Sequence, residues 1–201
     1  MKIQRFFKRQ IDFFGSLFGL IVLAPLFLII AVLIKIDSPG PVFFRQERVG
    51  KDGKIFRIWK FRTMVEGAEK IGLGFRVAKR DLRITNVGRF LRRLGIDELP
   101  QFVNVIFGEI SLVGPRPTLM YQVAKYSEFE KRRLLVKPGM ASLALIRGRN
   151  SLSWKERIEL DIWYIENWSL WLDLKILFKA PFSVLSGKGL YNKEGIVEDY
   201  E

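Results

Sequence analysis

Residues 13–34, FFGSLFGLIVLAPLFLIIAVLI, are the stretch that decides the fold of this chain. None of them is charged, and a straight helix of this length would be roughly 33 Å long, about the thickness of a bilayer core. The stretch is too long for the apolar part of a secretory signal, and DSPGP follows it instead of a small-residue cleavage site. We therefore predict a membrane segment that stays on the protein.

Pro25 lies in the middle of this segment, where it has no amide proton and would clash with the carbonyl of Ile21, so the helix is expected to kink or break. Both flanks are basic, and by the positive-inside rule both ends look cytoplasmic. The residues alone leave two topologies open, a bent helix that spans the membrane and a re-entrant hairpin that enters and leaves by one face. The flanking basic residues are Lys2, Arg5, Lys8 and Arg9 on one side and Lys35, Arg45, Arg48 and Lys51 on the other.

The composition restricts the chemistry and the partners. The chain has 201 residues, 49% of them hydrophobic, which is enough for one domain with one substantial core. A formal net charge of +13 indicates an anionic partner, such as nucleic acid, phosphorylated metabolites or anionic lipids. Because the chain has neither cysteine nor histidine, proton transfer has to use other groups, and a metal site has to be rich in oxygen, which favours magnesium.

The soluble part, residues 37–201, is predicted to be mostly helical with a small sheet. Two runs of alternating apolar and polar residues flank Asp52-Gly53, a pattern typical of a β-hairpin. Helical periodicity follows in LPQFVNVIF, in PTLMYQVAKYSEFEKRRLLV and from Trp154 onward. Tryptophans mix with charged residues over 154–182, which fits interfacial helices at a membrane and equally fits amphipathic helices of an ordinary core. The predicted fold class is α+β, predominantly helical, with a membrane anchor in residues 1–36.

A pair of acids lies in a basic setting at RFLRRLGIDELPQF, residues 89–102. Pro100 is tolerated in the first turn of a helix, so a helix is predicted to begin at Glu98 with Asp97 as its N-cap. That structural role would explain the pair without any chemistry. A helix N-terminus also attracts phosphate, so phosphates, a magnesium ion and a carboxylate could meet here. Three arginines precede the pair: Arg89, Arg92 and Arg93.

Two further arginines lie in stretches that could hold an anion. In Gly114-Pro115-Arg116-Pro117, prolines on both sides stiffen the backbone and reduce the entropy lost when Arg116 binds an oxyanion. A plain proline-rich turn fits the same residues. Gly148-Arg149-Asn150 places Arg149 beside a flexible glycine and gives a weaker signal of the same kind.

Taken together, these stretches resemble the bacterial sugar transferase family, and within it the small monotopic phosphoglycosyl transferases. The resemblance covers nearly the whole chain, and its motifs occur in the order of the family. The matching stretches are KRQIDFFGSLFGL with the central proline, IKIDSPGPVFFRQERVGKDGKIFRIWKFRTM, RDLRITNVGRFLRRLGIDELPQFVNVIFGEISLVGPRP, GRN and NWSLWLDLKIL.

The resemblance implies a reaction and the residues that carry it. Family members move a phosphosugar from a UDP-sugar to polyprenol phosphate at the cytoplasmic face of the bacterial inner membrane, which gives a polyprenyl-diphosphate sugar and UMP. The nucleophile of the family matches Asp97, where Mg²⁺ binds with the diphosphate, and the second acid matches Glu98. A ping-pong mechanism through an aspartyl-phosphosugar intermediate is implied. Three residues match arginines that hold phosphate: Arg92, Arg116 and Arg149.

The membrane segment of the family is a re-entrant helix broken at its proline, which favours that topology here. Family members usually have a serine before this proline, whereas this chain has Ala24 before Pro25, so no hydroxyl is present to bind a carbonyl freed by the break. The stretch from Met140 to Arg147 also departs from the usual pattern of the family, close to Arg149. The sequence does not specify the sugar, the polyprenol length, the oligomeric state or the pathway.

The residues alone also fit a second class, a membrane-tethered nucleic-acid-binding protein that uses the basic stretch Arg76–Arg93 against a phosphate backbone. This stretch has seven basic residues and one acid, Asp81, and it also fits a solvated face or a patch for anionic lipids. A membrane-surface scaffold without chemistry is a third class. The resemblance favours a UDP-sugar, polyprenol phosphate and membrane lipids as partners and no nucleic acid, and it leaves homo-oligomerisation open.

Overall fold

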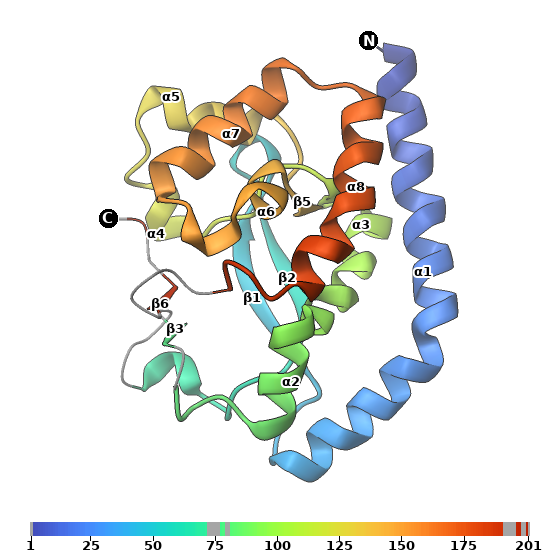
Figure 1. Cartoon of the computed structure of the whole chain (residues 1–201), viewed down its shortest axis with the longest axis vertical. Coiled ribbons are helices and arrows are strands. Elements are labelled where there is room, and N and C mark those ends of the chain that lie inside the picture. Colours follow the sequence, from blue (N-terminus) through green and yellow to red (C-terminus); the bar gives the residue numbers. More distant parts are fainter. Residues whose placement is uncertain (1, 72–76, 79–80, 191–195, 198–199, 201) are drawn as a thin grey trace.

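The computed structural model describes residues 2–71, 77–78, 81–190, 196–197 and 200 (Figure 1). A β-hairpin lies at the centre, helices surround it, and one long helix runs along one side of the molecule. The α-helices are α1 (Lys2–Asp37), α2 (Asn86–Leu94), α3 (Phe102–Phe107), α4 (Met120–Val123), α5 (Glu128–Lys131), α6 (Leu143–Arg147), α7 (Trp154–Glu166) and α8 (Leu170–Leu185).

The described strands form three small two-stranded sheets, and the predicted hairpin is confirmed. Strands β1 and β2 pair antiparallel from Phe43↔Phe61 to Val49↔Ile55, and Asp52 and Gly53 take positive φ in the turn between them. Strands β4 and β5 pair parallel, and β3 and β6 pair antiparallel. The strands are β1 (Phe43–Val49), β2 (Ile55–Phe61), β3 (Val77–Ala78), β4 (Ser111–Val113), β5 (Gly139–Ala141) and β6 (Ile196–Val197).

Helix α1 contains the apolar segment predicted to enter the membrane, and among the described helices it alone is long and apolar enough to cross one. It continues through Pro25 as one helix, and Figure 1 shows it bending in its medium-blue part before it passes under α2. The described residues therefore do not show two separate helices at Ala24-Pro25, and the re-entrant path stays a prediction. Large apolar side chains are exposed along its length, among them Ile3, Phe6, Phe18, Ile21, Leu28 and Ile36.

The second half of α1 packs on the soluble body through apolar contacts. Ile30 and Ile34 are buried in a cluster with Phe61 of β2 and Leu91 of α2. At the end of the helix, the carboxylate of Asp37 accepts a hydrogen bond from the backbone N–H of Val87, 2.8 Å away, in the first turn of α2. The end of the membrane segment is thus fixed to the helix that leads to Asp97.

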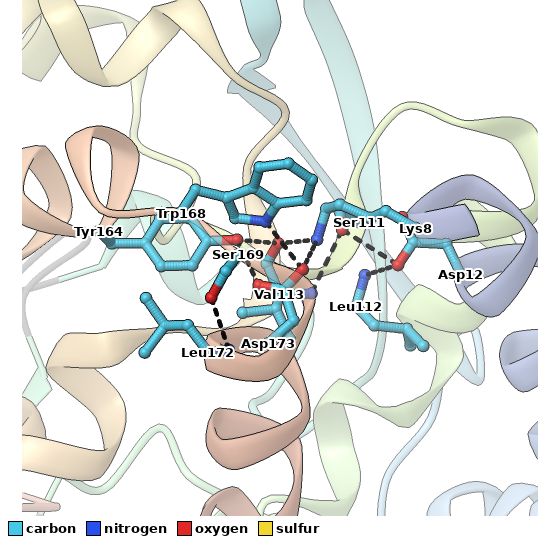
Figure 2. A network of polar contacts seen from close by, with 10 residues as sticks. All are labelled: Lys8, Asp12, Ser111, Leu112, Val113, Tyr164, Trp168, Ser169, Leu172 and Asp173. Carbon is cyan, nitrogen blue, oxygen red and sulfur yellow. Dashed lines mark hydrogen bonds and ion pairs between the residues drawn. The ribbon is translucent and has the colours of Figure 1, made fainter. Parts of the chain in front are cut away.

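The first half of α1 is held by a polar network that Figure 2 shows from close by. Lys8 Nζ lies 2.6 Å from the Asp173 carboxylate of α8 and donates to the carbonyl of Val113, 3.0 Å away, at the end of β4. The other contacts of Asp173 come from the Tyr164 hydroxyl at 2.7 Å and the Trp168 indole N–H at 3.0 Å. Asp173 is therefore fully satisfied, and Lys8 ties the membrane helix to both α8 and β4.

Two more residues of this half bind backbone groups of the body. Asp12 is buried and accepts hydrogen bonds from the Leu112 N–H at 3.0 Å and the Ser111 hydroxyl at 3.1 Å. Arg9 donates to the carbonyls of Val105 and Ile106, both 2.7 Å away, near the end of α3. A cation at a helix C-terminus satisfies carbonyls that have no partner within the helix.

Helices α7 and α8 show features of both structures predicted for residues 154–182, amphipathic core helices and helices at a membrane interface. Ile162 of α7 and Ile176 of α8 are buried, as in ordinary core helices. Other apolar side chains point outward, and α8 in particular exposes a stripe suited to a membrane interface. The exposed residues of this stripe are Trp171, Leu174, Phe178, Phe182 and Leu185.

The basic stretch Arg76–Arg93 is not a continuous cationic surface in its described part. Arg83 and Asp81 form a buried ion pair of 2.7 Å, so Arg83 is not available to a phosphate backbone. Arg89 and Arg93 are exposed, as a solvated face requires. Arg76, Lys79 and Arg80, which were part of this prediction, lie outside the described residues.

Candidate active site

The predicted site residues Arg92, Asp97, Glu98, Arg116 and Arg149 all line one cavity of about 820 Å³. They come from four separate parts of the chain, so the fold brings together what the sequence spreads over 58 positions, from 92 to 149 counted inclusively. Ala24 and Pro25 lie in α1 and are not among the residues that line this cavity.

The local structure at Asp97 differs from the predicted helix start. Gly95 takes the left-handed conformation, with φ of 67°, and ends α2; its N–H donates to the carbonyl of Arg92. A 3₁₀ helix, Ile96–Gln101, follows, with Gly95 in the N-cap position. Asp97 is therefore inside the first turn and is not an N-cap, so that prediction was wrong. Only glycine adopts this conformation at little cost, and the turn carries Asp97 into the cavity beside Arg92.

Glu98 is fully engaged by two cations. Lys60 Nζ lies 2.8 Å from its Oε1, and Arg116 binds both oxygens, Nη2 to Oε1 at 2.6 Å and Nη1 to Oε2 at 3.2 Å. Burial alone would raise the pKa of Glu98, but the charges of Arg116 and Lys60 lower it well below its ordinary value. Glu98 is therefore anionic at neutral pH, and its charge serves to hold the two cations in place.

Asp97 has the opposite environment. Among the described residues its carboxylate has no hydrogen-bond or ion-pair partner, although it lies beside the same cations. Burial and the neighbouring Glu98 carboxylate raise the pKa of Asp97, while the charges of Lys60, Arg92 and Arg116 oppose this rise. A carboxylate with a raised pKa is more basic, and its free oxygens can bond to an incoming group. Of the two acids, Asp97 is the one available for chemistry.

Arg116 sits on a turn whose backbone carbonyls accept hydrogen bonds at three consecutive residues, Pro115, Arg116 and Pro117. The Pro115 carbonyl accepts from the N–H of Gly139, 2.8 Å away, at the start of β5. The Pro117 carbonyl accepts from Arg48 at 3.2 Å, and the carbonyl of Arg116 itself accepts from Arg133 at 3.3 Å. The Arg116 side chain is still 55% exposed, so a rigid base carries a guanidinium that reaches into the cavity.

Arg149 lines the same cavity and begins a short 3₁₀ turn, Arg149–Ser151. It adopts φ of 54°, a left-handed conformation that is unusual for a residue with a side chain. Its Nη1 is buried and has no hydrogen-bond partner in the part of the chain that the structure describes. Burial lowers the pKa of Arg149, the charge of Arg116 adds to this effect, and Glu98 and Asp97 oppose it. Arg149 and Arg116 thus lie near each other with hydrogen-bonding capacity to spare, as an oxyanion site requires.

Sequence reasoning missed two basic residues of the site, Lys60 and Arg48. Both lie on the hairpin and line the cavity. Burial lowers the pKa of Arg48 to about 10, and the nearby Arg116 adds to the decrease. The signal was present in the alternation, because Lys60 follows the buried Phe56 and Ile58 on the inward face of β2. A lysine in an inward position of a strand needs an anionic partner, which here is Glu98.

The carboxylates of the cavity could bind magnesium only together with oxygen ligands from a substrate. In the part of the chain that the structure describes, no group of three or more acidic side chains could hold a metal by itself. Glu98 already binds two cations, so of the adjacent pair only Asp97 has a carboxylate without such a partner. Mg²⁺ commonly binds one or two carboxylates together with substrate phosphates, so these residues fit a metal that arrives with a diphosphate.

Comparison with known proteins gives the family. A family model described as bacterial sugar transferase matches residues 3–187. The chain belongs to the bacterial sugar transferase family. It is 43% identical over 183 residues to an uncharacterized sugar transferase, EpsL, of Bacillus subtilis, with 91% of this chain and 89% of that protein covered.

Two longer relatives have names that state an activity. The UDP-glucose:undecaprenyl-phosphate glucose-1-phosphate transferase of Klebsiella pneumoniae is 43% identical over 199 residues, with 94% of this chain and 42% of that protein covered. The UDP-N-acetylgalactosamine-undecaprenyl-phosphate N-acetylgalactosaminephosphotransferase of Aeromonas hydrophila is 43% identical over 193 residues, with 93% of this chain and 45% of that protein covered. This chain therefore spans less than half the length of these two bacterial sugar transferases.

Proposed function

We propose that this chain is a phosphoglycosyl transferase that moves a phosphosugar from a UDP-sugar to polyprenol phosphate, giving a polyprenyl-diphosphate sugar and UMP. The observation that carries the proposal is the contrast between the two acids. Glu98 is ion-paired with Lys60 and Arg116, whereas the adjacent Asp97 is free among cations that can hold phosphates. The names of the longer relatives support the same class of donor and acceptor.

In the proposed first step, an oxygen of Asp97 attacks the phosphorus that bears the sugar. A bond forms between this oxygen and phosphorus, the bond from phosphorus to the UMP oxygen breaks, and UMP leaves with its electron pair. In the second step, a phosphate oxygen of polyprenol phosphate attacks the same phosphorus and releases the Asp97 carboxylate. In this scheme the Asp97 carboxylate and the acceptor phosphate both attack as anions, so no histidine is needed to remove a proton.

The basic residues of the cavity would bind and orient the phosphates. Arg116 and Arg149 are placed to neutralise charge on the transferred group, and Arg92 and Lys60 surround the attacking carboxylate. Asp97 and the donor diphosphate would hold Mg²⁺, which supplies further neutralisation of phosphate charge when it is bound. Catalysis then depends on positioning and electrostatics, as is usual for transfer of phosphoryl groups.

A lipid acceptor fits the outer surface of the molecule. The exposed apolar side chains of α1 and of the α8 stripe support insertion into one membrane leaflet, with the cavity at the membrane surface. Near one end of α1, Lys8 binds Asp173 of the soluble body, and at the other end Asp37 binds Val87 of the same body. A spanning helix would put about 30 Å of lipid between its ends, so these contacts favour a re-entrant helix with both ends on the cytoplasmic face of the bacterial inner membrane.

The direct test is release of UMP. The full chain in detergent or nanodiscs is mixed with Mg²⁺, polyprenol phosphate and each of a series of UDP-sugars. At least one UDP-sugar should release UMP, and omission of polyprenol phosphate should stop continuous turnover. Absence of UMP release with every donor, from a well-folded protein in a membrane, would contradict the proposed function.

A further inference from the structure

The chain returns to the cavity after its last long helix. Helix α8 ends at Leu185, and the family model matches the chain only up to residue 187. The next residues run back to the turn that carries Arg149, and Leu190 is one of the residues that line the cavity. A segment outside the matched region therefore contributes to the wall of the site.

Two hydrogen bonds join this segment to the residue next to Arg149. The backbone N–H of Asn150 donates to the carbonyl of Gly189, 2.9 Å away. The side-chain amide of Asn150 donates to the carbonyl of Leu190 at 2.8 Å. Asn150 thus holds two consecutive carbonyls, which fixes both the distance and the orientation of the segment relative to the turn.

Gly189 packs directly against the backbone of the turn. It has a positive φ of 67°, and a Cβ atom built on it would lie 2.1 Å from the carbonyl oxygen of Gly148 and 3.3 Å from the Cβ of Arg149. Backbone atoms at 2.1 Å cannot yield by a simple side-chain rotation, so a larger residue at 189 has to displace the turn or the segment. The contact is possible only with glycine.

Arg149 needs such a support. Its φ of 54° lies in the left-handed region, which costs free energy for a residue with a Cβ atom and persists when the surroundings impose it. Within the turn itself, the Ser151 N–H donates to the carbonyl of Gly148 at 3.1 Å. The contacts with Gly189 and Leu190 come from outside the turn and hold it in place.

The same segment is also fastened farther along the chain. Strand β6 pairs with β3, Val77↔Val197 and Ala78↔Ile196. The Tyr200 ring packs against Trp154 and Tyr126, with centroids 5.5 and 5.2 Å apart. These contacts attach the described residues beyond Leu190 to the body as well.

We infer that Gly189 and Leu190 are positioning residues that hold the Arg149 turn so that the Arg149 guanidinium meets the donor diphosphate. The inference rests on the proposed function for the identity of that anion. The segment after residue 187 is then part of the donor site of this chain, rather than a passive extension of it.

A matched pair of glycines makes the test clean. Gly187 has nearly the same φ as Gly189, 66° against 67°, but a Cβ atom at Gly187 would meet nothing within 4 Å. Gly187→Ala and Gly189→Ala therefore cause the same backbone strain in the same segment, and only Gly189→Ala disturbs the turn. The KM for the UDP-sugar should rise about tenfold in Gly189→Ala and stay near the wild-type value in Gly187→Ala. The KM for polyprenol phosphate should not change in either variant.

Two further measurements separate positioning from loss of structure. In an Arg149→Ala background, Gly189→Ala should raise the donor KM no further, because the side chain that it positions is gone. Hydrogen exchange at the backbone N–H of Asn150 should be faster in Gly189→Ala than in Gly187→Ala. This measurement does not depend on catalysis.

The outcomes keep the two proposals apart. A wild-type chain that turns over, with equal donor KM values in the two glycine variants, would overturn the inference and leave the proposed function standing. An effect of Gly189→Ala that persists in full without Arg149 would overturn it as well. If no UDP-sugar reacts with the wild type, the proposed function fails, and equal exchange at Asn150 in the two variants would then overturn the structural part of the inference.

Discussion

Glu98 accepts hydrogen bonds from Lys60 and Arg116 on both of its oxygens, whereas the next residue back, Asp97, has no such partner among the described residues. A single ion-paired acid organises the cations, and the unpaired acid beside it is free to react. The structure thus gives different environments to two acids that are simply neighbours in the sequence.

Exchange of each acid for its amide tests this division. Asp97→Asn should lower kcat on the order of 10³-fold or more, because the amide is no nucleophile, while the melting temperature stays at or above the wild-type value. Glu98→Gln should lower kcat by about 10²-fold and also lower the melting temperature, because Lys60 and Arg116 lose their anionic partner. Steady-state UMP release and thermal unfolding measure the two effects. Near-normal turnover of Asp97→Asn would rule out Asp97 as the nucleophile.

Local sequence patterns predicted some of these residues and not others. The β-hairpin followed from alternation and from Asp52-Gly53, because both signals are local. The N-cap role of Asp97 was wrong, because the left-handed Gly95 is the N-cap of a helix that begins two residues earlier than predicted. The contacts of Lys60 with Glu98 and of Asn150 with Gly189 join residues 38 or more positions apart. The periodicity of a helix or strand concerns neighbouring residues only and cannot predict such pairs.

At the level of the elements, a buried ion pair holds the described part of the segment between β2 and α2. Arg83 bonds both oxygens of Asp81 and also donates to the carbonyls of Ala68 and Ile71, both 2.8 Å away. Ala68 lines the cavity, so this pair fixes one edge of the site. A stretch that looked like a cationic surface therefore contains a structural clamp.

The pH dependence of this clamp follows from the pKa of Asp81. Hydrogen bonds from the Arg83 side chain lower this pKa, so the stability that the pair contributes is present above the ordinary aspartate value of about 3.9 and is lost as the pH falls through the lower folded-state value. Asp81→Asn should cost about 3 kcal/mol at pH 7, a drop in melting temperature of roughly 6 to 12 °C. The difference from wild type should shrink as the pH is lowered toward 3.

Asp52→Asn is the matched control, because Asp52 is 60% exposed and its ion pair with Lys51 is 3.8 Å long. Its melting temperature should stay near that of the wild type at every pH. Equal losses in the two variants, or a loss in Asp81→Asn that does not depend on pH, would show that the ion pair is not the cause.

At the scale of the whole molecule, both halves of α1 are bound to one body. The first half uses the polar network around Asp173 (Figure 2). The second half uses apolar contacts around Phe61 and Leu91. The network also reaches Val113, the last residue of β4, which leads to Arg116. The membrane helix and the turn that carries Arg116 therefore share one rigid support.

This arrangement predicts that both ends of α1 lie on the cytoplasmic side. The chain contains no cysteine, so single cysteines can be placed at Lys2, at Lys51 and, as a control within the membrane, at Phe18. A membrane-impermeant thiol reagent should label the first two from the cytoplasmic side only and should not label the third. Labelling of positions 2 and 51 from opposite sides would establish a spanning helix.

Exchange of labelled UMP into a UDP-sugar in the absence of lipid shows directly whether Asp97 carries the phosphosugar. The full chain, Mg²⁺ and a UDP-sugar that has been shown to turn over are incubated with labelled UMP and without polyprenol phosphate. Because attack by Asp97 is reversible and precedes the acceptor, label should enter the UDP-sugar with the wild type and not with Asp97→Asn. Exchange that strictly requires polyprenol phosphate, or that survives in Asp97→Asn, would contradict the account.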